Sequence, residues 1–202
     1  MSICYLVGAG EFHGQISAED DDLIIAVDGG YDNLVRYGYT PDILIGDLDS
    51  IKSEVPESMR CVRYPKEKDE TDMLLAYEAG IKLGYSEFVM LGATGGRLDH
   101  TYANLSLLLY AKEQGHNVTV IDDYGMILCI KNESISLTGN PGANLSVFAM
   151  GGDAKGVTIH GAKYEVEGVT LTPSFPVGVS NEFSSAPAFI SVEDGALLII
   201  AE

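Results

Sequence analysis

Residues 88–115 read FVMLGATGGRLDHTYANLSLLLYAKEQG and hold the pattern that decides the fold. An apolar run at 88–91 leads through a glycine-rich segment into a helical pattern that begins near His100. Leu105, Leu108 and Leu109 form the apolar stripe of this pattern, and Gly115 ends it. Short continuous apolar runs are typical of strands buried on both faces of a parallel sheet. The stretch therefore predicts a strand, a loop and a helix in succession.

The same alternation of strand and helix extends over the first 125 residues. A second helix is predicted from an N-cap at Thr71, through Leu74, Tyr77 and Ile81, to Gly84. Further apolar runs predict buried strands at residues 3–7, 23–27, 43–45, 61–64 and 118–121. We therefore expect residues 1–125 to form an α/β domain with a mainly parallel sheet.

The pattern changes after residue 125, where no helix of useful length is predicted. Short alternating segments are separated by turn signals, which is typical of a small antiparallel sandwich or barrel. We expect residues 126–202 to form an all-β sandwich domain. Asp194-Gly195 stands between apolar segments at 189–192 and 197–200, and this spacing predicts a β-hairpin.

Composition limits the classes of function. The chain has 202 residues, 46% of them hydrophobic, and a net charge of −18. A protein this acidic lacks the clustered basic residues that bind nucleic acid, although a divalent cation can bridge carboxylates to nucleotide phosphates. Cys4, Cys61 and Cys129 lie far apart, so we expect buried free thiols. No apolar run approaches the roughly 18 residues that cross a bilayer, and we expect a soluble cytoplasmic protein without nucleic-acid or membrane partners.

Polar residues follow four of the predicted strands, at the carboxyl edge where open α/β sheets bind ligands. Asp28-Gly29-Gly30 follows the strand at 23–27, and the sequence GDLDS (46–50) follows the strand at 43–45. The other two strands are followed by Lys66, Lys68, Asp69, Thr71 and Asp72, and by Thr94, Gly95, Gly96, Arg97, Asp99 and His100.

Four aspartates in these segments are candidate metal ligands. Asp28, Asp47, Asp49 and Asp72 converge if the strands are neighbours, and converging carboxylates repel one another unless they are protonated or bound to a cation. Hard oxygen ligands favour Mg²⁺ or Mn²⁺. Any one of these aspartates can equally cap a turn or a helix, but four at successive strand ends favour a metal site.

The glycine-rich segment is a candidate phosphate-binding loop. Consecutive glycines at 95–96 let backbone N–H groups approach a phosphate at the start of a helix, and Arg97 adds a bidentate donor. The alternative is a tight turn without a ligand. Lys66 and Lys68 are either solubilising residues or phosphate clamps, and His100 either donates to a phosphate or only begins the helix. The residues by themselves indicate a Mg²⁺-dependent nucleotide enzyme.

The motifs, in this order, resemble the thiamine pyrophosphokinase family. They are Asp28-Gly29-Gly30, GDLDS (46–50), KDETD (68–72), TGGRLDH (94–100) and the Ser180-Asn181 pair in VSNEF (179–183). The resemblance implies an α/β domain followed by a β-sandwich, and a homodimer with its active site between subunits. It also implies transfer of the pyrophosphoryl group of ATP to the thiamine hydroxyl, which releases AMP.

The resemblance further implies a role for each motif residue. Asp47, Asp49 and Asp72 would hold Mg²⁺. As a mechanism we expect Asp72 to accept or orient the thiamine hydroxyl proton, and Arg97 with a lysine to stabilise charge during transfer. Ser180 and Asn181 would contact thiamine from the partner subunit. Because the chain has no Trp, an aromatic platform for thiamine would fall to a Tyr or a Phe, and Phe183 is one candidate. The residues implied in ATP binding are Asp28, Gly29, Gly30, Lys68, Asp69, Thr94, Gly95, Gly96, Arg97, Asp99 and His100.

Three other functions share some of these motifs. The acceptor could be another hydroxymethyl heterocycle, such as a pterin, although Ser180-Asn181 favours thiamine. A nucleotide-sugar transferase could use Asp47 and Asp49, but it would leave KDETD and TGGRLDH unexplained. A non-catalytic nucleotide or thiamine sensor would not need a base for an attacking hydroxyl.

Overall fold

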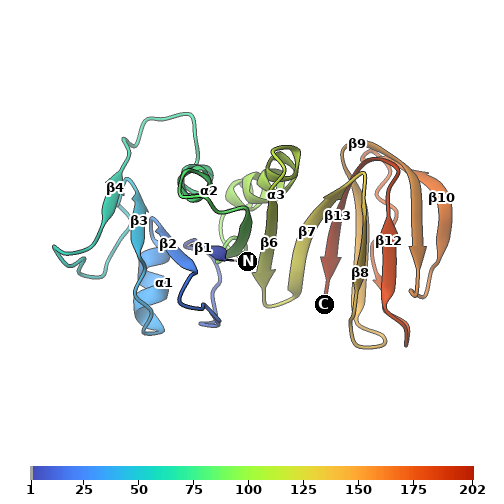
Figure 1. The fold of residues 1–202 in the computed structure, drawn as a ribbon, viewed down its shortest axis with the longest axis horizontal. Coiled ribbons are helices and arrows are strands. Elements are labelled where there is room, and N and C mark those ends of the chain that lie inside the picture. The colour runs from blue at the N-terminus through green and yellow to red at the C-terminus, as the bar shows by residue number, and fades with distance from the viewer. Residues whose placement is uncertain (1) are drawn as a thin grey trace. The chain divides into compact units, whose positions relative to one another are not determined.

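A computed structural model describes residues 2–202, which form mostly β-strands and three helices (Figure 1). The chain divides into two compact units. The first comprises the residues up to 107 together with 115–123, and the second comprises 108–114 and 124–202. The division passes through the helix α3 (Leu98–Glu113).

The first unit contains six strands that pair in parallel. Their order across the sheet is β4-β3-β2-β1-β5-β6, so the chain starts in the middle and builds outward in both directions. The six strands lie at the predicted apolar runs, and their bounds differ from the predicted ones by at most one residue at either end: β1 (Ile3–Val7), β2 (Leu23–Val27), β3 (Ile43–Gly46), β4 (Cys61–Arg63), β5 (Glu87–Leu91) and β6 (Asn117–Asp122).

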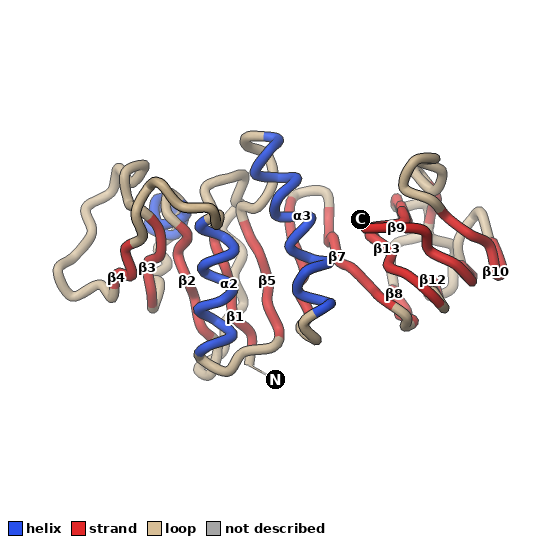
Figure 2. The backbone as a smooth tube through the Cα atoms, turned by 90° about the horizontal axis from the view of Figure 1, so that it is seen from above, coloured by secondary structure: helices blue, strands red, loops and turns tan. Residues whose placement is uncertain are grey.

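Helices lie on both faces of this sheet, and successive side chains of β1 point to opposite faces. Tyr5 and Val7 pack in one cluster with Tyr31 and Leu34 of α1 (Gly30–Arg36). The helix α2 (Asp72–Lys82) covers the other face, as Figure 2 shows. This two-sided burial explains why the strands are continuously apolar.

The short helix α1 is absent from the sequence prediction. It has seven residues and begins at a glycine, so it offers neither a capping side chain nor a long apolar stripe. Its position depends on Gly30, because a Cβ there would lie 1.8 Å from the Val7 carbonyl oxygen. Close backbone packing against β1 therefore fixes the start of α1, and the sequence pattern does not reveal it.

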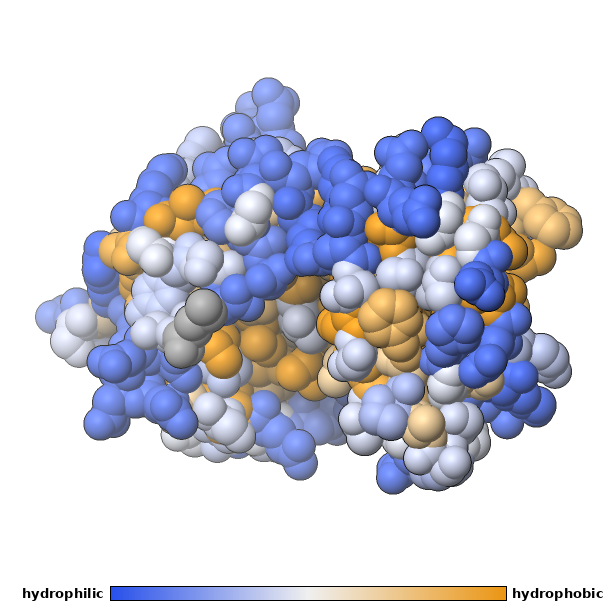
Figure 3. All heavy atoms as spheres, turned by 45° about the vertical axis from the view of Figure 1, so that its right-hand side comes forward, coloured by the Kyte–Doolittle hydropathy of each residue, from blue (hydrophilic) through white to orange (hydrophobic). Residues whose placement is uncertain are grey.

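Antiparallel pairing dominates the second unit. The long strand β9 (Asn144–His160) is the shared partner of four other strands. The core includes the buried side chains of Leu145, Val157 and Leu197, and Figure 3 shows that other apolar side chains reach the surface of this unit. The β-sandwich stays a prediction. The remaining strands are β7 (Gly125–Lys131), β8 (Ser134–Leu137), β10 (Val166–Leu171), β11 (Asn181–Glu182), β12 (Ala188–Ser191) and β13 (Asp194–Ala201).

The hairpin predicted at Asp194-Gly195 is wrong. β12 pairs with β8 and β9, whereas β13 pairs with β7 and β9. Ile190 faces Ile159 near one end of β9, and Leu198 faces Phe148 closer to its other end. The turn signal is real, because Gly195 has φ +114°, but β9 is long enough to take both neighbouring strands as partners. A local sequence pattern cannot reveal that a strand far away in the sequence pairs with both segments.

The three cysteines are free, and Cys4 and Cys129 are buried, as expected, but Cys61 is exposed because β4 is the edge strand of the sheet. Burial raises the pKa of Cys4 to about 12 and that of Cys129 to about 11, so both remain neutral thiols at pH 7. Among residues 2–202, no helix is both long enough and apolar enough to span a membrane.

The central strand of the parallel sheet is the first place to test the fold. Leu6 in β1 is 0% exposed, whereas Leu98 at the start of α3 is 81% exposed. Leu6→Ala leaves a cavity, and we expect it to lower the free energy of unfolding by about 2–5 kcal/mol in urea titrations. The matched control Leu98→Ala should change it by no more than about 0.5 kcal/mol. Equal effects of the two substitutions would contradict the placement of β1.

Candidate active site

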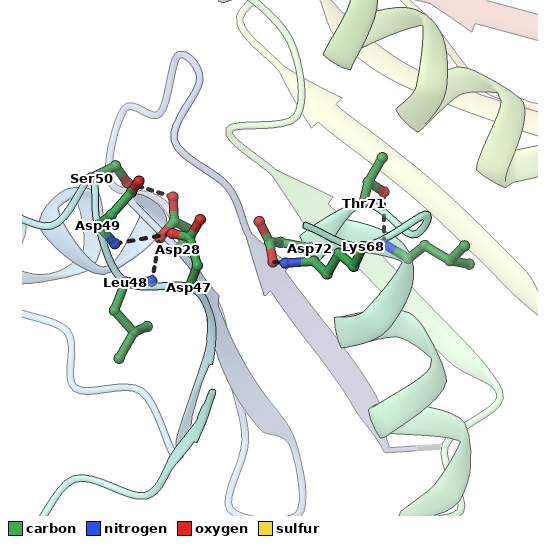
Figure 4. A network of polar contacts seen from close by, with 9 residues as sticks. Asp28, Asp47, Leu48, Asp49, Ser50, Lys68, Thr71 and Asp72 are labelled. Carbon is green, nitrogen blue, oxygen red and sulfur yellow. Dashed lines mark hydrogen bonds and ion pairs between the residues drawn. The ribbon is translucent and has the colours of Figure 1, made fainter. Parts of the chain in front are cut away.

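Three aspartates converge at the carboxyl edge of the parallel sheet. Asp28 follows β2, and Asp47 and Asp49 follow β3, which pairs with β2. One carboxylate oxygen from each of the three lies within 4.8 Å of the other two (Figure 4). The parallel sheet places these acids together because neighbouring strands end at the same edge.

The backbone around this acidic group adopts a conformation that is unusual for its residues. Asp28 has φ +46° and Leu48 has φ +65°, both in the left-handed region. The Asp28 carboxylate accepts hydrogen bonds from the Leu48 N–H at 3.2 Å and from the Ser50 hydroxyl. The Asp49 N–H donates to Asp47 Oδ1 at 3.0 Å. These bonds hold the two loops in the conformation that brings the carboxylates together.

Lys66 supplies positive charge on one side of the group. Its ammonium donates to Asp49 Oδ2, and this hydrogen bond lowers the pKa of Asp49 and raises that of Lys66. Asp49 is therefore ionised at neutral pH. Both side chains are well exposed, so solvent screens the pair and Lys66 can leave it at little cost.

Asp72 lies at the start of α2, on the side that faces the acidic group (Figure 4). Thr71 caps this helix, as predicted, and its Oγ1 accepts a hydrogen bond from the Leu74 N–H at 3.2 Å. Lys68 Nζ contacts Asp72 Oδ1 at 2.6 Å in a partly buried ion pair. Asp72 is not in the group of three carboxylates, and its assignment as a metal ligand stays a prediction.

The TGGR segment lies at the same edge, between β5 and α3. Gly95 has φ +76°, which favours glycine, and a Cβ there would lie 2.3 Å from Glu11 Cγ. The Thr94 hydroxyl donates to Asp122 Oδ2 at 3.0 Å. Asp122, at the end of β6, thus holds the loop, and no local motif marks it in the sequence.

Arg97, Asp99 and His100 form a connected set at the start of α3. The Arg97 guanidinium binds both Asp99 oxygens, with Nε at 3.1 Å and Nη2 at 2.6 Å. The His100 N–H donates to Asp99 Oδ1 at 3.0 Å. The hydrogen bond from Arg97 lowers the pKa of Asp99, and both side chains remain exposed to solvent. Arg97 is thus held near the loop with its charge available to an anion.

A cavity of about 310 Å³ connects these elements within the first unit. Asp28, Asp72, Arg97 and His100 line it, as do parts of the glycine-rich segment. A segment that sequence reasoning missed also lines it, namely residues 8–10 after β1. The volume is within the range of small-molecule sites, and acids and anion donors share its walls.

The acidic group has the chemistry of a divalent-cation site. Its ligands are carboxylate oxygens, which Mg²⁺ and Mn²⁺ prefer. Mg²⁺ holds its ligands at about 2.0–2.1 Å, so oxygens within 4.8 Å of one another fit around one ion with little movement. A bound cation would also offset the mutual repulsion of the carboxylates.

The two parts of the chain match two different domains of known proteins. Residues 15–120 match the catalytic domain of thiamin pyrophosphokinase, and residues 130–197 match the vitamin B1 binding domain of thiamin pyrophosphokinase. The chain belongs to the thiamin pyrophosphokinase family. It is therefore a transferase enzyme of the kinase type.

Individual thiamin pyrophosphokinases align over most of their length. The chain is 26% identical over 188 residues to the thiamine pyrophosphokinase of Bacillus subtilis, covering 90% of this chain and 88% of the relative. It is 24% identical to thiamin pyrophosphokinase 1 of Caenorhabditis elegans, covering 87% of this chain and 77% of the relative.

Solved structures agree with the fold. The crystal structure of the Bacillus subtilis enzyme superposes with a TM-score of 0.88 at 24% identity, covering 100% of this chain and 99% of that one. A thiamin pyrophosphokinase family protein from Enterococcus faecalis gives a TM-score of 0.84 at 27% identity, covering 98% of each chain. At 24% identity, the likeness to the Bacillus subtilis structure is evidence of a shared fold only.

The Ser180-Asn181 pair lies in the part that matches the vitamin B1 binding domain. Ser180 has φ +58°, and its N–H donates to Ser146 Oγ at 3.1 Å. Asn181 is buried and binds the Tyr164 backbone in both directions, at 2.9 Å and 2.8 Å. Asn181 thereby holds Tyr164, whose side chain is 62% exposed. Direct contact between this pair and thiamine stays a prediction.

The assignment of Phe183 as the thiamine platform is wrong. Its side chain is 3% exposed and belongs to the core of the second unit. A Cβ on Gly139 would lie 2.4 Å from Phe183 Cδ2, so the ring fills the space beside that glycine. The sequence places an aromatic residue next to Ser180-Asn181, but an inward position in the strand pattern removes it from any ligand.

The acidic group predicts a measurable metal affinity. Asp28→Asn removes one charge from the group while preserving the shape of the side chain, and we expect it to weaken Mn²⁺ binding about tenfold or more in isothermal titrations. Asp20→Asn, in an exposed turn outside the cavity, should bind Mn²⁺ as the unmodified chain does. Equal Mn²⁺ affinities for the two variants would contradict the site.

Proposed function

We propose that this chain transfers the pyrophosphoryl group of ATP to the hydroxyl oxygen of thiamine, giving thiamine diphosphate and AMP in a Mg²⁺-dependent reaction. The observation that carries the proposal is the cavity that Asp28 of the acidic group lines together with the glycine-rich segment, in a chain that matches both family domains. Transfers of this kind depend on positioning and charge neutralisation more than on covalent help from the protein.

Asp47 and Asp49 would hold Mg²⁺ together with Asp28, and Asp72 would join them. When bound, the ion supplies positive charge that offsets repulsion between the phosphates and these carboxylates. Lys66 offers its charge to Asp49 in the structure described here, and it would be free to move toward phosphate oxygens once a cation takes over this role.

The anionic part of ATP would lie against the donors of the cavity. We assign backbone donation to the segment containing Thr94, Gly95 and Gly96, and bidentate donation to Arg97, which Asp99 orients. Arg97 would stabilise charge on the transferred group or on AMP. The remaining residues assigned to ATP are Asp28, Gly29, Gly30, Lys68, Asp69 and His100.

Asp72 is assigned as the group that accepts or orients the proton of the thiamine hydroxyl. It lies at the start of α2, where Lys68 Nζ contacts its Oδ1 at 2.6 Å and holds the carboxylate in place. A carboxylate at the cavity wall is within reach of a hydroxyl bound in the cavity, which is the position that a proton acceptor requires.

Thiamine binding is assigned to the second part of the chain. We propose a homodimer in which Ser180 and Asn181 reach the active site from the partner subunit, as the family resemblance implies. Asn181 would act partly through Tyr164, whose exposed ring can pack against a flat, cationic heterocycle. We further propose an α/β domain at 1–125, a β-sandwich domain at 126–202, and a cytoplasmic location.

Product analysis tests the reaction. Purified protein with ATP, Mg²⁺ and thiamine should give AMP and thiamine diphosphate in equal amounts, and EDTA should abolish both, because the carboxylates then lack their cation. AMP without thiamine diphosphate would contradict the assigned acceptor, and release of ADP would contradict pyrophosphoryl transfer.

Asp72→Asn tests the proton acceptor. The substitution removes the basic oxygen but preserves shape, so we expect kcat to fall more than about 100-fold while the urea midpoint stays close to that of the unmodified chain. Asp153→Asn, at an exposed position in the second unit, is the matched control and should leave kcat unchanged. Near-normal turnover in Asp72→Asn would refute the assignment.

A further inference from the structure

Asn33 is a buried polar side chain that the reaction described above does not use. It lies in α1 and is 7% exposed. Its Nδ2 donates two hydrogen bonds, to the Gly8 carbonyl oxygen at 2.9 Å and to the Gly10 carbonyl oxygen at 3.0 Å. Both amide hydrogens are therefore committed to the short loop that follows β1.

These two hydrogen bonds fix the orientation of the peptide groups in the loop. No peptide bond in the described residues is cis, and in a trans peptide the carbonyl and the following N–H point in opposite directions. Because the carbonyls of Gly8 and Gly10 point toward Asn33, the N–H groups of Ala9 and Glu11 point away from it.

The neighbouring N–H groups already have acceptors in the protein. Glu11 donates to the Thr94 carbonyl at 2.9 Å, Gly10 to the Gly92 carbonyl at 2.8 Å, and Gly8 to the Leu91 carbonyl at 2.8 Å. Within residues 2–202 the Ala9 N–H has no such acceptor. Ala9 is exposed and lines the cavity of about 310 Å³.

Close packing prevents the loop from adopting another backbone conformation. A Cβ on Gly10 would lie 2.0 Å from the Thr94 carbonyl oxygen, and one on Gly8 would lie 2.7 Å from the Gly92 carbonyl oxygen. The loop thus packs backbone against backbone on the segment after β5, and Asn33 holds its other side. A donor fixed in this way needs no reorganisation when an acceptor arrives.

We infer that the Ala9 N–H is a binding donor for an anionic oxygen of the nucleotide, and that Asn33 is the positioning residue that orients it. This inference rests on the proposed function for the identity of the ligand. A backbone N–H beside phosphate oxygens forms a charge-assisted hydrogen bond, which is stronger than a bond between neutral groups. The loop after β1 would thus contribute an N–H donor for an anion, in addition to the donors of the glycine-rich segment.

Two substitutions separate the donor from the residue that orients it. Ala9→Pro removes the N–H and leaves Asn33 in place, whereas Asn33→Ala removes the orientation and leaves the N–H. Each should raise the Kd for ATP with Mg²⁺, measured by isothermal titration, about tenfold or more, and should raise KM for ATP similarly. KM for thiamine should stay within about twofold of the original value.

The control for the proline substitution is Ala18→Pro, at another exposed alanine of the same unit that lies outside the cavity. It should bind ATP as the unmodified chain does. Urea unfolding of all variants distinguishes a local loss of binding from unfolding. If Asn33→Ala does not fold, Ala9→Pro still decides whether the N–H binds the nucleotide.

A double-mutant cycle provides the readout that a merely structural Asn33 would not give. If Asn33 acts through the Ala9 N–H, adding Asn33→Ala to Ala9→Pro should not weaken ATP binding further. Equal weakening by Asn33→Ala in both backgrounds would overturn the positioning role, and unchanged ATP affinity in Ala9→Pro would overturn the donor itself. Because ATP binding is measured directly, these outcomes remain decisive even if the unmodified chain makes no thiamine diphosphate, a result that would refute the proposed function alone.

Discussion

Mutual repulsion among the carboxylates of Asp28, Asp47 and Asp49 is the constraint on which the site depends. Three acids with oxygens within 4.8 Å of one another destabilise a fold unless positive charge or hydrogen-bond donors offset the repulsion. The protein offers Lys66, the Ser50 hydroxyl and the backbone N–H groups of Leu48 and Asp49, but these leave the group short of positive charge. A divalent cation would complete the balance, and the nucleotide phosphates that accompany such an ion would then have a place beside an otherwise acidic surface.

The parallel sheet explains how such an arrangement can be built. Strands β2 and β3 end at the same edge and deliver the acids, while β1 and β5 end beside them and deliver loops that pack backbone against backbone. Glycines permit that packing, and the buried amide of Asn33 holds the loop after β1 from behind. The same edge therefore offers oxygen ligands for a cation and N–H donors for an anion, which is the combination that a metal–nucleotide complex requires.

The features that the sequence could predict are those with a local signal. Buried parallel strands show as continuous apolar runs, and the Thr71 cap and the aspartates at the strand ends show by their positions. Features that depend on contacts between distant segments were missed or wrongly predicted. Helix α1 starts where Gly30 meets β1, and Asp122 reaches the glycine-rich segment through its hydrogen bond with Thr94. β12 and β13 do not pair as a hairpin at Asp194-Gly195, because β9 is the partner of both strands. Phe183 points into a core that the sequence could not place.

Location of the bound metal tests the central claim most directly. Crystals grown with Mn²⁺ and ATP can be measured at the manganese absorption edge, where the ion gives an anomalous difference peak. The account predicts a peak within coordination distance of oxygens from Asp28, Asp47 and Asp49, at about 2–2.3 Å. Manganese bound elsewhere in the chain, with these three carboxylates still held only by Lys66, Ser50 and the loop backbone, would contradict it.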